Sequence, residues 1–185
     1  MYGKNHVTYV TPNGFDDISE GRARPGHFQG VATIVAKLFN IVQPTNAYFG
    51  QKDAAQCCLI KRIVEDLNMN LNVVVLDTVR EDDGLAMSSR NAYLTDEERQ
   101  VAPVVYRSLC AAKELYDKTR NVQSSDLMNA TRTVLASEPL VSEIQYISVD
   151  SKATMQPLEM VTEEGAVISL ACKVGSVRLI DNIVI

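Results

Sequence analysis

The stretch Ala47-Tyr48-Phe49-Gly50-Gln51-Lys52-Asp53 joins a short apolar strand to a glycine turn that carries a lysine and an aspartate. Apolar side chains then recur at helical spacing, which predicts an amphipathic helix that closes at Asn68. These side chains are Ala55, Leu59, Ile63 and Leu67. A second apolar run, Val73-Val74-Val75-Leu76, predicts a buried strand. Strand, helix and strand in this order indicate a parallel α/β unit.

Another helix is predicted upstream of this stretch, again from apolar side chains at helical spacing. They are Val31, Ile34, Val35, Leu38 and Phe39. Gln43-Pro44 ends this helix, because proline cannot continue a helix and favours extended geometry at the residue before it. Since helices and apolar strands alternate here, we expect a parallel sheet that is covered by helices on both faces.

The pattern changes after Asp77. Thr95-Asp96-Glu97-Glu98 has the capping-box sequence of a helix start, and Pro103 predicts a short turn before a main helix from about residue 102 to 118. Further elements are a helix at about 125–137 and strands around 144–149, 166–170 and 177–185.

The predicted fold class is therefore α/β in two parts. Residues 1–77 form a partial Rossmann-like unit with a parallel sheet, the second half of a nucleotide-binding domain. Residues 78–185 form a small α+β lid domain with a three-stranded antiparallel sheet.

Composition excludes several classes of protein. The 185 residues are 46% hydrophobic and 22% charged, as in ordinary globular proteins, and the net charge of −5 argues against nucleic acid or an anionic membrane as a partner. No apolar run is long enough to span a bilayer, and no export signal is visible, so we expect a cytoplasmic location. Four cysteines without a C-x-x-C pair and only two histidines predict free thiols and no metal site.

The turn at Gly50 to Asp53 follows the carboxyl end of a strand and precedes a helix, where ligands bind in open parallel sheets. Free backbone N–H groups and the helix dipole favour an anion there, and Lys52 adds a full positive charge. Asp53 could cap the same helix. The alternative, that Gly50 merely makes the turn and Lys52 is a solvated surface charge, remains open from this motif alone.

A second candidate loop is Met87-Ser88-Ser89-Arg90-Asn91. It combines small hydroxyl side chains with an arginine, whose planar fork of donors suits phosphate oxygens. Its alternative is a polar surface turn in which Arg90 pairs with Asp82 or Asp83. Two cation-bearing loops together favour a triphosphate as the shared ligand.

Other residues carry weaker signals. His27 follows Pro25-Gly26 at a helix start beside Arg22 and Arg24, whose charges lower its tendency to protonate, so a hydrogen-bonding role suits it better than that of a general base. Gln56, one turn beyond the lysine, could reach a ligand or could be an exposed helix residue. The apolar side chains Val31, Ile34 and Val35 belong by default to the core, although one of them could also wall a small apolar substrate.

The order and spacing of four segments resemble the pantothenate synthetase (pantoate–β-alanine ligase) family. The segments are Arg24-Pro25-Gly26-His27-Phe28-Gln29-Gly30-Val31-Ala32-Thr33, Phe49-Gly50-Gln51-Lys52-Asp53, Thr78-Val79-Arg80-Glu81 through Met87-Ser88-Ser89-Arg90-Asn91, and Gly175 to Arg178-Leu179-Ile180-Asp181-Asn182. The resemblance runs from about Glu20 to the end. Where many relatives have a glutamate, this chain has Gln51, which removes a charge but keeps the lysine.

The resemblance implies condensation of pantoate with β-alanine, using Mg²⁺ and ATP and passing through a pantoyl adenylate, with pyrophosphate and then AMP released. It implies catalytic roles for Lys52, Ser88, Ser89 and Arg90. The implied ATP-binding residues are Gly50, Gln51, Lys52, Asp53, Val79, Met87, Ser88, Ser89 and Arg90. The implied pantoate-binding residues are Gln56, Val31, Ile34, Val35, His27 and Arg24.

One departure is large. Members of the family begin with a long segment that carries a first strand, an H-x-G-H motif and a second pantoate glutamine, and nothing in this chain matches it. We therefore expect negligible ligase activity from these residues alone, and an unpaired sheet edge in the first unit. The resemblance also implies a homodimer. The rival hypotheses are a noncatalytic interaction module that kept the fold and another adenylate-forming enzyme.

Overall fold

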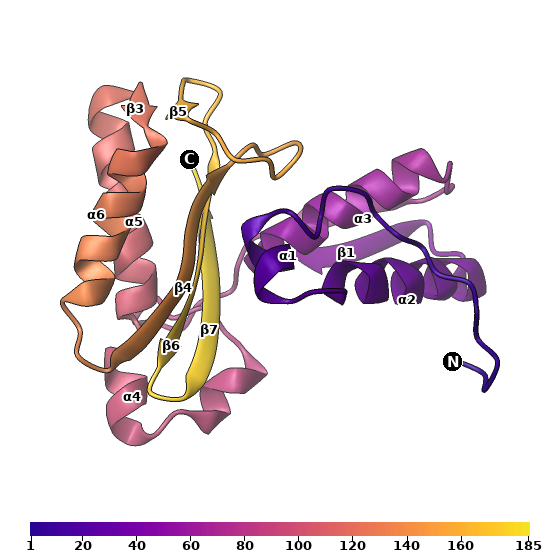
Figure 1. The fold of residues 1–185 in the computed structure, drawn as a ribbon, viewed down its shortest axis with the longest axis horizontal. Helices are drawn as coiled ribbons and strands as arrows, with labels where there is room; N and C mark the ends of the chain where they lie inside the picture. The colour runs from indigo at the N-terminus through magenta and orange to yellow at the C-terminus, as the bar shows by residue number, and fades with distance from the viewer.

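The computed structural model describes all of residues 1–185 and has two lobes (Figure 1). The smaller lobe contains α1 (Ser19–Ala23), α2 (His27–Val42), β1 (Asn46–Gly50), α3 (Ala54–Asp66) and β2 (Asn72–Leu76). The larger lobe contains α4 (Asp96–Val101), α5 (Val104–Thr119), β3 (Val122–Gln123), α6 (Ser124–Ala136), β4 (Val141–Asp150), β5 (Met160–Val161), β6 (Val167–Val174) and β7 (Val177–Val184).

The smaller lobe is built on the predicted parallel pair of strands, β1 and β2, with Tyr48 opposite Val74. Helices α2 and α3 pack against each other and against one face of this pair, where Phe49 joins their hydrophobic core. The other face stays open, since Tyr48 is 62% and Leu76 53% exposed. The expectation of helices on both faces was therefore wrong. Neither outer edge of the two-stranded sheet has a partner strand within residues 1–185.

The larger lobe holds the predicted three-stranded antiparallel sheet, in the order β4-β6-β7. Because side chains alternate along a strand, each strand has an apolar and a mostly polar series. The apolar series, for example Ile147, Leu170 and Leu179, packs against helices α5 and α6. The opposite face of the sheet lies toward the smaller lobe (Figure 1). This second face supplies one wall of the site described below.

The helix boundaries of the larger lobe follow the sequence signals. In α4 the Thr95 Oγ1 accepts from the Glu98 N–H at 3.2 Å and a Glu98 carboxylate oxygen accepts from the Thr95 N–H at 2.8 Å, which is the predicted capping box. Pro103 separates α4 from α5, as expected for a residue without an N–H. The short α1 helix and the two-residue β3 and β5 pairing have no clear sequence pattern and were not predicted.

Two clusters of buried hydrophobic side chains stabilise the chain, one in each lobe. Met155 and Val167 of the larger lobe belong to the smaller lobe's cluster, so the lobes also pack directly on each other. An ion pair between Glu20 of α1 and Arg178 of β7 adds a second link, with oxygen to nitrogen distances of 2.6 and 3.3 Å. No helix is both long and apolar enough to cross a membrane.

Candidate functional site

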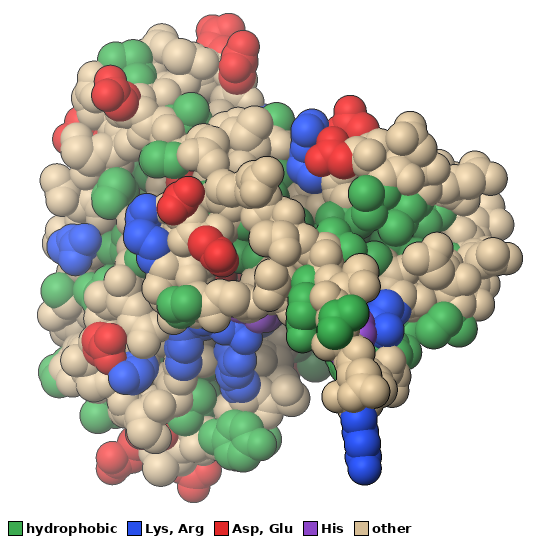
Figure 2. Space-filling view, turned by 45° about the vertical axis from the view of Figure 1, so that its right-hand side comes forward, with side chains coloured by type: hydrophobic (Ala, Val, Ile, Leu, Met, Phe, Trp, Pro, Cys, Tyr) green, Lys and Arg blue, Asp and Glu red, His purple; other side chains and the backbone are tan.

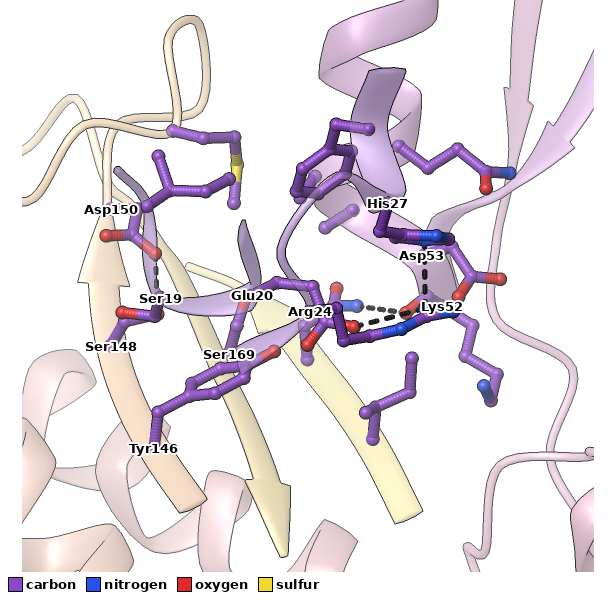
Figure 3. Close-up of a pocket in the computed structure, with 18 of the residues that line it drawn as sticks. Ser19, Glu20, Arg24, His27, Lys52, Asp53, Tyr146, Ser148, Asp150 and Ser169 are labelled. Carbon is purple, nitrogen blue, oxygen red and sulfur yellow. Dashed lines mark hydrogen bonds and ion pairs between the residues drawn. The ribbon is translucent and has the colours of Figure 1, made fainter. Parts of the chain in front are cut away.

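A cleft lies between the lobes and receives side chains from both (Figure 3). The smaller lobe contributes polar side chains from three segments, and the larger lobe contributes side chains from its sheet, most of them on the face turned toward the smaller lobe. From the smaller lobe these are Ser19, Glu20, Arg24, His27, Lys52, Asp53 and Gln56; from the sheet they are Tyr146, Ser148, Asp150, Ser169, Asp181 and Asn182. The mixture of cationic, carboxylate and amide groups suits a charged, polar ligand.

Basic side chains also gather on the outer surface near this cleft. The space-filling view shows a group of lysine and arginine side chains beside the groove between the two lobes (Figure 2). The chain as a whole is acidic, with a net charge of −5. Any attraction for an anion is therefore local to this region of the surface.

The lysine turn enters this cleft at the carboxyl end of β1, as the sequence predicted. Gly50 ends the strand, a single 3₁₀ turn spans Gln51–Asp53, and α3 begins at Ala54. Asp53 could have capped α3, but its carboxylate makes no capping hydrogen bond and is exposed in the cleft. The inserted 3₁₀ turn gives Asp53 a φ of −102° and ψ of 60°, which differ from the extended geometry typical of a capping residue.

A second, smaller cavity adjoins the first, and residues of both predicted loops line it. Lys52, Ser88 and Arg90 all line it. Ile180 and Asp181 of β7, together with Lys52, line both cavities, so the two cavities are direct neighbours. Two cations from segments far apart in the sequence thus face one space, an arrangement suited to a polyphosphate.

The serine–arginine loop is held by its own short-range hydrogen bonds. The Ser88 Oγ accepts from the Arg90 N–H at 3.2 Å, and the Asn91 side chain donates to the Ala86 carbonyl at 3.1 Å. Arg90 forms no ion pair with either aspartate named as its alternative partner, because Asp83 pairs instead with Arg99 of α4. The Arg90 guanidinium therefore keeps its donors for the cavity.

His27 begins α2 and Arg24 follows α1 just before it, and both line the cleft (Figure 3). The Arg24 Nη1 lies 2.8 Å from the His27 Nε2, and because arginine can only donate, this ring nitrogen accepts. Burial and, secondarily, the Arg24 charge lower the pKa of His27. The predicted hydrogen-bonding role of a neutral imidazole agrees with this geometry, with burial as the larger cause.

Other predicted residues lie away from the two cavities. Val35 is buried in the core of the smaller lobe, and Val31 and Ile34 pack beside that core. The remaining ones are Gly50, Gln51, Val79, Met87 and Ser89, none of which lines either cavity. Val79 and Met87 lie beside each other, since the Met87 N–H donates to the Val79 carbonyl at 2.9 Å, and both side chains are largely exposed.

A row of polar side chains crosses the sheet of the larger lobe and was not among the predicted site residues. Ser148, Ser169 and Asn182 lie opposite one another across β4, β6 and β7, and all three side chains are buried. The Ser169 Oγ has no hydrogen-bond partner. Polar residues inside otherwise apolar strands were the available signal, and Asp181-Asn182 in β7 was the clearest example.

Asp150 sits at the inner end of this cleft, 4% exposed, and accepts a hydrogen bond of 2.6 Å from the Ser148 hydroxyl. Burial raises the pKa of Asp150 to about 6, although Ser148 and Arg22 oppose the shift. Between pH 3.8 and about 6 the folded state therefore binds more protons than the unfolded state, and stability falls as the pH rises.

Replacing Asp150 with asparagine is expected to raise the free energy of unfolding by up to about 3 kcal/mol at pH 7.5. Asparagine keeps an acceptor for Ser148 and removes the cost of a buried charge. Urea unfolding of both proteins at pH 7.5 and pH 4 measures the effect, and the difference should almost vanish at pH 4. A variant that is less stable than the parent at pH 7.5 would show that Asp150 gains more from Arg22 than burial costs.

Comparison with known proteins gives the family of this chain. The family model described as pantoate-beta-alanine ligase matches residues 1–184. The chain belongs to the pantoate-beta-alanine ligase family. A pantothenate synthetase from Chloroflexus aggregans is 50% identical over 183 residues, which cover 98% of this chain and 65% of that protein. The chain thus spans slightly less than two thirds of the length of such relatives.

Solved structures of the ligase family agree with the fold. A pantothenate synthetase from Thermus thermophilus superposes with a TM-score of 0.91 at 41% identity, covering 99% of this chain and 65% of that chain. A pantoate-beta-alanine ligase from Francisella tularensis, complexed with beta-gamma ATP and β-alanine, has a TM-score of 0.67 at 33% identity and covers 96% of this chain and 58% of that one. The predicted family and two-part α/β fold are confirmed.

Proposed function

We propose that this chain carries part of an ATP-dependent ligase that joins pantoate to β-alanine through a pantoyl adenylate. Membership of the ligase family and the ATP and β-alanine bound to the Francisella tularensis relative support the substrates. The observation that carries the proposal is the cavity shared by Lys52, Ser88 and Arg90. The adenylate, the residue roles and the domain boundary between 77 and 78 are parts of this proposal.

In the first step, an oxygen of the pantoate carboxylate attacks the α-phosphorus of ATP and pyrophosphate leaves. Negative charge builds on the departing phosphates, and Lys52 and Arg90 face the space where it develops. Ser88, Ser89 and backbone N–H groups of both loops supply further donors, with Gly50 and Gln51 shaping the first loop. Val79 and Met87, whose side chains are largely exposed, are assigned to the adenine.

In the second step, the β-alanine amine attacks the acyl carbon, AMP leaves, and the nitrogen loses a proton. Gln56, at the first turn of α3, is assigned to pantoate, and His27 with Arg24 supports the floor of the cleft. Val31, Ile34 and Val35, which belong to or pack against the core of the smaller lobe, are assigned to the dimethyl end of pantoate.

Mg²⁺ is expected to arrive with the triphosphate. A Mg²⁺ ion bound to phosphates needs only one or two protein carboxylates. Asp53 offers one, since it is exposed in the cleft next to Lys52. The ion would neutralise charge on the phosphate oxygens.

The isolated residues 1–185 are expected to show negligible ligase activity. The match leaves about a third of each relative's own length uncovered. In residues 1–185, the sheet of β1 and β2 has two unpaired edges and one open face. The test compares the isolated chain with a complemented enzyme, in which residues 1–185 are joined to the part of the Chloroflexus aggregans protein that the match leaves uncovered.

The measurement is AMP release that depends on pantoate, ATP and β-alanine together. We expect turnover by the complemented enzyme and at least about a 100-fold lower rate from the isolated chain, a range typical of losing catalytic groups. Robust turnover by the isolated chain would refute the expected inactivity. No turnover and no ATP binding by a folded complemented enzyme would refute the ligase function and favour a noncatalytic module. Pyrophosphate exchange without pantoate would indicate another adenylate-forming enzyme.

Two further proposals concern the cellular compartment and the oligomeric state. The four cysteines are all free thiols, which suits a reducing compartment such as the cytoplasm. A homodimer, as in the family, is expected for the complemented enzyme and is tested by its mass in solution.

A further inference from the structure

We infer that the Asp181-Asn182 pair of β7 is a positioning device that sets the distance between the two cation-bearing loops. This inference rests on the proposed function for its catalytic consequence, but its structural part can be tested without it. Neighbouring residues of a strand point to opposite faces of the sheet, so the two side chains reach in opposite directions. Asn182 hydrogen-bonds to the lysine turn, and Asp181 pairs with Arg80 in the segment that precedes the serine–arginine loop.

Asn182 holds the lysine turn. Its side-chain N–H groups donate to the carbonyls of Gln51 at 2.9 Å and Lys52 at 2.8 Å, and its Oδ1 accepts from the Gln51 side chain at 3.2 Å. These bonds join residues that are about 130 positions apart and lie in different lobes. Asn182 is 3% exposed, so its loss would leave these carbonyls without a partner at the lobe interface.

Asp181 holds the other loop through Arg80. Its two carboxylate oxygens accept from the Arg80 guanidinium at 2.6 and 3.0 Å, and both side chains are largely buried. The same guanidinium donates to the Gly84 carbonyl at 3.1 Å and stacks on the Tyr106 ring, with its carbon 3.7 Å from the centroid. Asp181 of β7 and Tyr106 of α5 therefore fix the position of the Arg80 guanidinium.

Arg80 belongs to a hairpin-like arm, residues 79–87, which leads to the serine–arginine loop. Arg80 pairs with Ala86 in an antiparallel bridge, and hydrogen bonds from Met87 to Val79 and from Glu81 to Leu85 close the arm. Ser88 begins directly after it. Fixing Arg80 thus fixes the position from which Ser88 and Arg90 reach the cavity.

Asp181 and Asn182 are also linked to each other by a hydrogen bond. The Asp181 Oδ1 also accepts from the Asn182 N–H at 2.8 Å, which orients the carboxylate and the backbone together. The path from one loop to the other therefore runs through Arg80, Asp181, Asn182 and Lys52 without a gap. A bidentate ion pair and paired amide bonds suit this task because they define orientation as well as distance. The backbone segments that carry Lys52 and Arg90 are therefore held in place before any ligand arrives.

Hydrogen exchange on the 185-residue chain tests the device directly. We expect Asn182→Ala to raise amide exchange within residues 50–56 about fivefold or more and to leave residues 79–91 within about twofold of the parent. Asp181→Asn should give the opposite pattern. Ser142→Ala is the matched control, because it removes a bond of 2.6 Å to the Gly175 carbonyl at the same sheet, and Ser142 makes no hydrogen bond to either loop.

Equal loosening of both loops by either variant, or no change within 50–56 in Asn182→Ala, would overturn the inference. So would loosening of β6, residues 167–174, to the same degree, because this result would mean general unfolding of the sheet. These outcomes do not depend on any reaction.

Kinetics of the complemented enzyme test the consequence. Asn182→Ala is expected to lower kcat/KM for ATP about tenfold, the effect of about one to two hydrogen bonds, with most of the loss in kcat. In a Lys52→Ala background the same change should cost less than about twofold, because the group that Asn182 positions is gone. Equal losses in both backgrounds would show a merely structural role and overturn the positioning claim. Absence of any turnover in the parent would instead reject the proposed function, and hydrogen exchange would still decide the inference.

Discussion

Replacing Lys52 or Arg90 with alanine is expected to lower kcat/KM for ATP in the complemented enzyme by about 10² to 10³-fold, the range for removing one electrostatic group from a transition state. Both side chains line the cavity where the departing pyrophosphate is proposed to lie. The rate of AMP release at several ATP concentrations gives the loss. If the cations stabilise developing charge more than bound ATP, kcat should fall more than KM rises.

Arg62→Ala is the matched control for these replacements. Arg62 lies on α3, in the same lobe as Lys52, and its exposed guanidinium pairs only with Glu65 and Asp66 on its own helix. We expect its removal to change kcat/KM less than twofold, since exposed pairs contribute little. A loss of less than fivefold in both Lys52→Ala and Arg90→Ala would contradict the proposed roles of these cations.

Replacing Glu20 with glutamine is expected to lower the free energy of unfolding by about 3 kcal/mol at pH 7, because it leaves a buried arginine without its charge partner. The Glu20 and Arg178 side chains are 11% and 18% exposed and link α1 of one lobe to β7 of the other. Urea unfolding measures the loss. Glu65→Gln, which disturbs only an exposed pair on α3, should change stability by less than about 0.5 kcal/mol.

The pH dependence of this loss provides a second check. Burial alone would raise the pKa of Glu20, but hydrogen bonding and attraction from Arg178 outweigh it and hold the pKa below its ordinary value of 4.5. The contribution of Glu20 to stability is therefore present above pH 4.5 and is lost as the pH falls through the lower, folded-state pKa. The difference between Glu20→Gln and the parent should shrink below about pH 4. A difference that stays constant from about pH 7 to about pH 3.5 would contradict a charge-based role.

Much of the fold could be predicted because local signals agreed with it. Helical spacing, the capping box at Thr95 and the glycine turns at Gly165 and Gly175 all fall where elements begin or end. The open face of the β1 and β2 sheet could not be predicted, since an apolar run such as Val73 to Leu76 looks the same whether one or both faces are covered. Which face the helices cover is decided by the packing of α2 on α3.

The candidate site was only half visible in the sequence. Lys52, Arg90 and Gln56 stand in loops or helix starts with few structural reasons to be there, so their chemistry is readable from local context. Asn182 and Arg178 act through partners more than 100 residues away, and no local pattern contains such contacts. Asp53 shows the converse error, because a good capping residue was prevented from capping by the 3₁₀ turn that precedes α3.

The shared grip of the lysine turn and the serine–arginine loop on one triphosphate is tested most directly by amide chemical shifts during a titration of the complemented enzyme with ATP and Mg²⁺. Residues 50–53 and 87–91 are expected to shift together, with a single dissociation constant, and both sets of shifts should weaken in Lys52→Ala and in Arg90→Ala. Shifts confined to one loop, or two loops that titrate with different constants, would contradict a common nucleotide site.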